Sequence, residues 1–173
     1  SVICPDVIPQ KYDYFARITD HIKREDATII AVDVADKSLL GDLKAEFGDI
    51  VDLNIDHHIS NTKFAKNLLL DADAAATAEI IFELLTLLKV NINDITVKAL
   101  YTGIITDTGG FRYSNVTAKT HIIAAMLYDY NIDASEINRL MFDTKSKKLL
   151  ELEKQVLETA EFHFEDKCML LCV

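Results

Sequence analysis

The chain has few cysteines and no hydrophobic run long enough to cross a membrane. Cys4, Cys168 and Cys172 are an odd number without zinc-type spacing, which argues against a disulfide framework and a structural zinc site. We therefore expect reduced, buried cysteines in a cytoplasmic protein. No apolar stretch reaches the roughly 18 residues that a transmembrane helix needs, and no secretory leader is visible.

Basic residues are also scarce relative to acidic ones. The 18 Lys and Arg residues are outnumbered by 28 Asp and Glu residues, which gives a formal net charge of -10. Non-specific coating of nucleic acid needs a basic face, so this class of function is disfavoured. A small phosphorylated substrate held through metal ions remains compatible with the charge, because divalent cations bind clusters of carboxylates.

The chain contains no internal repeat and no low-complexity linker, and half of its residues are apolar. Its 173 residues suit one domain with the remnant of a second. Apolar, β-branched residues 28–34 predict a strand buried on both faces, as in a parallel sheet. Strands alternating with helices predict an α/β fold with a mostly parallel sheet flanked by helices in three layers. We expect strands at 28–34, 50–56, 68–70 and 167–173, and helices at 10–24, 38–47, 74–90, 95–105, 117–129, 133–142 and 145–161.

Acidic and imidazole side chains follow two of the predicted strands. Asp33 and Asp36 come at the end of the first, and the second ends in Asp56, His57 and His58. Because ligands bind beyond the carboxyl ends of parallel strands, we expect these groups to meet at one edge of the sheet. Together with Asp107, predicted in a loop before two glycines, they form a ligand set suited to Mn²⁺ and less selectively to other divalent ions.

Each of these residues also has a simpler interpretation. Asp56 and Asp33 could cap the helices that follow them, and Asp107 could merely shape a turn, since Asp and Gly favour turns. Arg112 could be an ordinary surface charge. The recurrence of acids and histidines after three separate apolar elements favours a metal site over these alternatives. His21, His121 and His163 lie on helical patterns and receive no role.

The same residues resemble a known family, the DHH phosphoesterases. The Asp56-His57-His58 triplet is a weak signal alone, but its combination with the segment from Gly103 through Asp107 to Ser114 is highly specific. The resemblance is strongest to the branch that degrades very short oligoribonucleotides and 3′-phosphoadenosine 5′-phosphate (pAp), and it covers essentially the whole chain. It rests on Val32, Asp33, Ile55, Asp56, His57, His58, Asn61, the segment from Ala76 to Glu79, the segment from Leu100 to Gly103, and the segment from Asp107 to Ser114.

The resemblance implies two-metal phosphoester hydrolysis and a role for each matched residue. It implies that Asp33 bridges two Mn²⁺ ions, with Mg²⁺ or Co²⁺ as substitutes, and that His57 and Asp107 bind one of them. His58 and Asp56 would contact the scissile phosphate or support the ligands, as the catalytic pair. The residues expected to bind substrate are Arg112, Gly109 and Gly110.

The resemblance also implies that the chain is a fragment. The family's upstream motif, His-x-x-Pro-Asp-x-Asp, does not occur, and the family's Gly-Gly-His substrate clamp is absent. We therefore expect an N-terminally truncated phosphoesterase domain at residues 1–144, a linker helix at 145–165 and the first strand of a C-terminal domain at 166–173. An isolated fragment of this kind would be inactive.

The implied partner is a short single-stranded RNA or a small nucleotide, and a homodimer remains open. Two alternative functions remain open. One is a cyclic-di-AMP phosphodiesterase or an inorganic pyrophosphatase of the same superfamily. The other is a non-catalytic nucleotide-binding module with a degenerate site, which an intact upstream motif would exclude.

Overall fold

The structure is a computed structural model that describes residues 2–12, 14 and 27–172. The chain divides into two compact units, residues 1–138 and residues 139–173. Most of the helix expected at residues 10–24 lies outside the described residues. The described part of that stretch contains the short 3₁₀ turn η1, Gln10–Tyr12.

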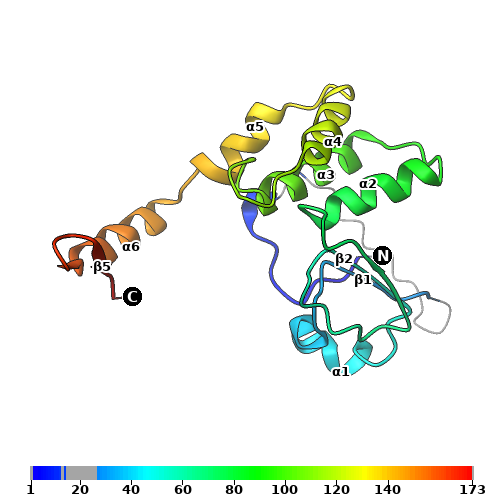
Figure 1. The fold of residues 1–173 in the computed structure, drawn as a ribbon, viewed down its shortest axis with the longest axis horizontal. Helices are drawn as coiled ribbons and strands as arrows, with labels where there is room; N and C mark the ends of the chain where they lie inside the picture. Colours follow the sequence, from blue (N-terminus) through cyan, green and yellow to red (C-terminus); the bar gives the residue numbers. More distant parts are fainter. Residues whose placement is uncertain (1, 13, 15–26, 173) are drawn as a thin grey trace. The chain divides into compact units, whose positions relative to one another are not determined.

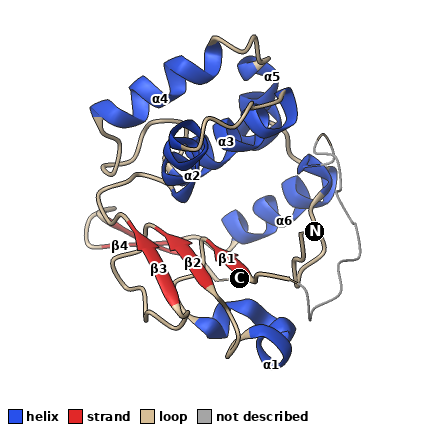
Figure 2. Cartoon of the chain, turned by 90° about the vertical axis from the view of Figure 1, so that its right-hand side faces the viewer, coloured by secondary structure: helices blue, strands red, loops and turns tan. Residues whose placement is uncertain are grey.

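The first unit is built on a parallel sheet with the strand order β1-β2-β3. Ile30 pairs with Leu53, and Leu53 pairs with Asn67, so the strands lie in register from their first residues. Helical segments lie on both sides of this sheet, with α1 on one side and α2 and α3 on the other (Figures 1 and 2). The predicted α/β fold is therefore confirmed. The strands are β1 (Ile30–Val32), β2 (Leu53–Asp56) and β3 (Asn67–Leu70).

Burial of β1 differs from the prediction. Ala31 is buried, but Ile30 and Val32 are 51% and 47% exposed. The prediction of a strand buried on both faces is wrong because β1 is the edge strand of the described sheet. The central strand β2 is the buried one, and Asn54, Ile55 and Asp56 are each at most 3% exposed.

The helices of the first unit bury their apolar faces against the sheet and one another. Ile80 on α2 packs with Ile55 and Ala74 in one core cluster. Short α1 follows a 3₁₀ segment, η3, because Gly41 takes a positive φ of 55° that interrupts an α-helix. The helices are η3 (Lys37–Leu43), α1 (Lys44–Phe47), α2 (Thr77–Leu87), α3 (Asp94–Asp107), α4 (Ala118–Tyr128) and α5 (Ala134–Asn138).

Several helix ends follow from local capping. Asn93 accepts a hydrogen bond from the Thr96 amide at the start of α3, as expected of an N-cap. Thr117 and Thr120 form a reciprocal capping box at the start of α4. Asn131 takes a positive φ of 56° just beyond α4, as is common where a helix ends.

The second unit begins with a π-helical turn, η4 (Arg139–Asp143), and continues with α6 (Lys147–Glu158). The strands β4 (Glu161–His163) and β5 (Cys168–Leu170) form an antiparallel hairpin. The helix predicted over 145–161 therefore ends earlier, because alternating aromatic residues from Phe162 onward favour a strand. The domain boundaries proposed from the sequence stay a prediction.

The predictions about cysteine burial and about membrane-spanning helices can be compared with the structure. Cys4, Cys168 and Cys172 are free but exposed, so the prediction of buried cysteines is wrong. Cys168 lies on a two-stranded hairpin, which is too small to bury both of its faces. Within the described residues, no helix combines the length and the apolar character needed to span a membrane.

Candidate metal centre

Four side chains expected to form a metal site come together at the carboxyl edge of the sheet. Asp33 follows β1, and His57 and His58 follow β2, so parallel pairing brings them to the same edge. Ligand atoms of these three residues lie within 4.8 Å of one another. The Nε2 atom of His57 is 3.7 Å from a carboxylate oxygen of Asp33 and 3.8 Å from one of Asp107.

Asp107 reaches this edge from a helix. It is the last residue of α3, so the prediction that it lies in a loop is wrong. Helix α3 continues to Asp107 because its buried residues Ile104 and Ile105 pack in the core up to that point. Placement at a rigid helix end holds the Asp107 carboxylate toward His57 more firmly than a loop would.

His57 is oriented as a metal ligand. Its Nδ1 atom lies 3.0 Å from the carbonyl oxygen of Ala74, which can only accept a hydrogen bond. Nδ1 therefore carries a proton, and Nε2 faces Asp33 and Asp107. A ligating histidine commonly donates its second N–H to a carbonyl in this way. Ala74 can serve because residues 74–76 precede α2, whose predicted start at residue 74 was three residues early.

His58 is held differently, by the buried carboxylate of Asp56. The Nδ1 atom of His58 lies 2.7 Å from an Asp56 oxygen, and the Asp56 side chain is fully buried. The hydrogen bond that His58 donates to Asp56 is the main reason that the pKa of His58 is raised. Burial would raise the pKa of Asp56, but hydrogen bonds from Asn61 and His58 outweigh it and lower that pKa below its ordinary value.

The remaining carboxylates form a concentrated negative site. Burial, followed by repulsion from Asp33, raises the pKa of Asp107. Asp33 takes a positive φ of 62°, which is strained for a non-glycine residue, and the Thr77 hydroxyl donates to its carboxylate at 2.8 Å. Backbone strain and a dedicated hydrogen bond at one ligand are typical of functional sites.

Asp36, the other acid after β1, does not join this group in the metal cluster. Its carboxylate accepts hydrogen bonds from the Ser38 amide at 2.8 Å and from the Thr62 hydroxyl at 2.9 Å. It is the N-cap of η3. The capping role considered for Asp33 therefore falls to Asp36.

The loop after Asp107 contains the residues expected to bind substrate. Gly109, Gly110 and Phe111 all have positive φ values of 57–68°. The Gly109 amide donates to the Thr106 carbonyl and the Gly110 amide to the Ile105 carbonyl, at 3.3 and 2.7 Å. The Nε of Arg112 donates to the Gly109 carbonyl. The loop is thus tied to the end of α3.

Sequence reasoning gave no role to several residues that organise the site. Thr77 holds Asp33, and Asn115 donates to the carbonyls of Ala75 and Asp107 at 2.9 and 3.2 Å. Asn54 and Asn61 form a buried pair behind Asp56. Asn54 had a visible signal, since it is a polar residue in the middle of an apolar strand.

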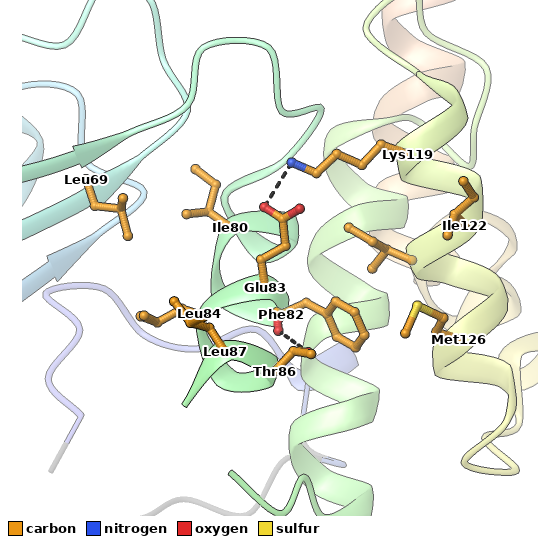
Figure 3. A pocket seen from close by; sticks show the side chains of 11 residues that line it. Leu69, Ile80, Phe82, Glu83, Leu84, Thr86, Leu87, Lys119, Ile122 and Met126 are labelled. Carbon is orange, nitrogen blue, oxygen red and sulfur yellow. Dashed lines mark hydrogen bonds and ion pairs between the residues drawn. The ribbon is translucent and has the colours of Figure 1, made fainter. Parts of the chain in front are cut away.

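A separate apolar groove of about 720 Å³ lies between α2 and α4 beside β3. Figure 3 shows Phe82, Leu84 and Met126 among its lining residues, with Lys119 bonded to Glu83 at its rim. None of the metal-cluster residues lines this groove. The chemistry therefore concentrates at the sheet edge and not in the groove.

Comparisons with known proteins identify relatives of this chain. No protein-family model matches the chain. It is 37% identical over 139 residues to the bifunctional oligoribonuclease and PAP phosphatase NrnA of Thermus thermophilus, a match covering 80% of the chain and 41% of the relative. It is 32% identical to a probable NrnA of Streptococcus mutans, over 79% of the chain and 44% of the relative. The NrnA of Bacillus subtilis is 30% identical, over 73% of the chain and 41% of the relative.

A solved structure has the same fold. The crystal structure of an exopolyphosphatase-related protein from Bacteroides fragilis matches with a TM-score of 0.74 and 24% identity, over 83% of this chain and 44% of the other. The likeness shows a shared α/β fold. Relatives at 30–37% identity are named bifunctional oligoribonuclease and PAP phosphatase, which confirms the resemblance to this branch of the DHH phosphoesterases seen in the motifs. The chain spans about two fifths of the length of these curated relatives.

The residues present fit a divalent cation. The Nε2 atom of His57 lies under 4 Å from one carboxylate oxygen each of Asp33 and Asp107, and these two carboxylates repel each other unless a positive charge, a cation or a proton on Nε2, lies between them. Mixed carboxylate and imidazole ligands suit first-row divalent metals. The chemistry of the donor set therefore supports a metal centre, while leaving the choice of metal to the proposal that follows.

Proposed function

We propose that a full-length protein containing this chain is a metal-dependent phosphoesterase. It hydrolyses short oligoribonucleotides to 5′-mononucleotides and pAp to AMP, and it works in the cytoplasm. The observation that carries the proposal is the orientation of His57, whose Nδ1–H is used by Ala74 while Nε2 faces Asp33 and Asp107. Relatives named oligoribonuclease and PAP phosphatase supply the substrate class.

Asp33, His57 and Asp107 are the residues that would hold the metal, with Mn²⁺ preferred and Mg²⁺ or Co²⁺ as substitutes. Such ions polarise phosphoryl oxygens and lower the pKa of bound water. The chain contributes the orientation of each ligand. Thr77 fixes the Asp33 carboxylate, the Ala74 carbonyl fixes the His57 ring, and α3 fixes Asp107.

His58 and Asp56 are the proposed catalytic pair. With Nδ1 bonded to Asp56, His58 can present Nε2 as a donor to a phosphoryl oxygen, and its raised pKa favours the protonated form that donates. In the reaction, a water oxygen bonds to phosphorus, and the bond from phosphorus to the leaving oxygen breaks. The departing alkoxide takes up a proton and leaves as a hydroxyl.

Arg112, Gly109 and Gly110 are proposed to contact the substrate. The side chain of Arg112 is exposed and would add a charge-assisted bond to phosphate. The Gly109 and Gly110 amides already donate to carbonyls. A Cβ atom at Gly109 would overlap the ring of Tyr113, so Gly109 is proposed to make room for that ring, and the close approach of substrate is proposed at Gly110.

Hydrolysis assays of the full-length protein with Mn²⁺ test the proposal. We expect turnover of the dinucleotide pApA and of pAp to be lost in Asp33→Ala and in His57→Ala, with the fold preserved by circular dichroism. Retained turnover in either variant would contradict the assigned roles. Preference for cyclic di-AMP or pyrophosphate would assign the protein to another branch of the superfamily, and binding of nucleotides without turnover would indicate a non-catalytic module.

The 173-residue chain alone is expected to show negligible turnover. It spans about two fifths of the length of its relatives, and its cluster offers few ligands for a pair of ions. Assaying the chain beside the full-length protein checks this expectation. Comparable rates for the two would contradict it.

A further inference from the structure

A buried pair of asparagines lies directly behind the Asp56–His58 contact. Asn54 is 0% exposed in the middle of β2, and Asn61 is 8% exposed in the turn that follows His58. The Nδ2 group of Asn61 donates to Asn54 Oδ1 at 2.7 Å and to Asp56 Oδ2 at 2.6 Å. The proposed function assigns no task to either asparagine.

The orientation of both amides follows from their partners. Asn54 Nδ2 faces the carbonyls of Ala31 and Val34, at 3.4 and 3.2 Å, which only accept hydrogen bonds. Its Oδ1 must therefore face Asn61. The Asn61 Oδ1 accepts from the Lys63 amide at 2.7 Å, which leaves its Nδ2 to donate to Asn54 and Asp56. No rotation of either amide satisfies these partners equally well.

The pair completes the hydrogen bonding of a fully buried carboxylate. Asp56 Oδ1 accepts from the His57 amide at 2.8 Å and from His58 Nδ1 at 2.7 Å. Asn61 supplies a donor to the other oxygen, Oδ2, at 2.6 Å. A buried carboxylate that loses a donor bears a large desolvation cost, which rotation of the carboxylate or uptake of a proton would relieve. Either change would alter the contact with His58.

We propose that Asn61, braced by Asn54, is a positioning residue that fixes the Asp56 carboxylate and through it the orientation of the His58 ring. The series of hydrogen bonds runs from the carbonyls of Ala31 in β1 and Val34 beyond it, through Asn54, Asn61 and Asp56, to His58. It links the segment that contains Asp33, between these two carbonyls, to the direction in which His58 presents Nε2. This inference rests on the proposed role of His58, but the contact itself exists without metal or substrate.

Nuclear magnetic resonance of the ¹⁵N-histidine-labelled chain tests the proposal without metal or substrate. In the unmodified chain, we expect the Nδ1–H proton of His58 to be visible and protected from exchange with water by Asp56. In Asn61→Ala, we expect its exchange to become faster by about tenfold or more, or its signal to disappear. The Nδ1–H of His57, bonded to Ala74, is an internal control that should stay unchanged.

Asn67→Ala is the matched control, because it removes an exposed asparagine that donates to the Asp52 carbonyl on the same sheet. Its spectrum should resemble that of the unmodified chain. If Asn61→Ala does not fold, Asn61→Leu, which has a similar size and no hydrogen-bond donor, takes its place with the same expectation. An unchanged His58 signal in a folded variant overturns the proposal. Loss of the fold in both variants also overturns it, by assigning Asn61 to stability alone.

The outcome is separable from that of the proposed function. A protected His58 proton that depends on Asn61, in a protein without hydrolytic activity, supports the positioning role and contradicts the catalytic proposal. If hydrolysis depends on His57 but exchange of the His58 Nδ1–H proton is the same in Asn61→Ala, the catalytic proposal is supported and the positioning role is contradicted.

Discussion

At the scale of single residues, the two adjacent histidines have different environments. His57 uses a backbone carbonyl to fix its ring, so its Nε2 faces the carboxylates. His58 is bonded to the buried Asp56 carboxylate, so a charged group fixes the orientation of its ring. The two rings are neighbours, with centroids 4.5 Å apart, but different partners hold them, which is how one triplet can supply both a ligand and a catalytic group.

Asp36 provides a test of the local electrostatics outside the metal cluster. Hydrogen bonds from Ser38 and then Thr62 lower its pKa from 3.8 to about 2. Because the folded-state pKa lies below the unfolded value, the stabilisation from Asp36 is present above about pH 4 and is lost as the pH falls through about 2. We expect Asp36→Asn to unfold at lower urea than the parent at pH 6, with the difference vanishing near pH 2. Urea midpoints across this range measure it, and a difference that stays constant with pH would contradict the account.

The sequence predicted which residues meet at the edge, because strand ends and apolar periodicity are local patterns. Asp33, His57 and Asp107 were found in this way. Thr77 and the Ala74 carbonyl were not, because their roles depend on where α2 begins relative to β1 and β2. Because α2 begins at Thr77 and not at residue 74, the Ala74 carbonyl lies before the helix and can accept a hydrogen bond from His57.

At the scale of elements, the close crossing of α2 and α3 positions Asp107 against the sheet. A Cβ atom added at Gly103 would lie 2.9 Å from Ala78 Cβ. Gly103 is thus the residue that lets the two helices approach. The sequence marked this position only as part of a family motif, since helical periodicity does not reveal an interhelical distance.

Gly103→Ala should therefore destabilise the chain. Overpacking costs about 1–3 kcal/mol, and the gain in helix propensity returns up to about 1 kcal/mol, which leaves a net loss of roughly 1 kcal/mol. Adding Ala78→Gly should relieve the contact, so the double variant should be more stable than the sum of the single changes predicts. Urea unfolding of all four chains gives this coupling energy. If the effects of the two single changes on the free energy of unfolding simply add, α2 and α3 can move apart without cost, and the prediction is contradicted.

Glu79 on α2 presents a second test at this scale. It is fully buried, and both of its carboxylate oxygens lack a hydrogen-bond partner within the described ranges. Glu79→Met keeps a similar volume and removes the unsatisfied group, so we expect the free energy of unfolding to rise by about 1–3 kcal/mol. Glu83→Met, on the exposed side of the same helix, removes only an exposed ion pair with Lys119, so it should lower this free energy by at most about 1 kcal/mol. A loss of stability in Glu79→Met would reveal a favourable interaction of this carboxylate.

At the scale of the whole molecule, all described members of the metal site lie in the unit of residues 1–138. The alternation of strands and helices predicted the parallel sheet because each apolar run was long enough to identify. Burial on both faces of β1 could not be predicted, since it depends on which strand occupies the sheet edge. The formal charge of -10 suits a site that attracts cations before it binds an anionic substrate.

Calorimetric titration of the chain with Mn²⁺ tests the central claim most directly. We predict weak binding that is lost in His57→Ala and retained in His163→Ala, which removes an imidazole of the second unit. The binding should be weak because the described cluster supplies few ligands. Unchanged binding in His57→Ala, or sub-micromolar binding of two ions, would contradict the account.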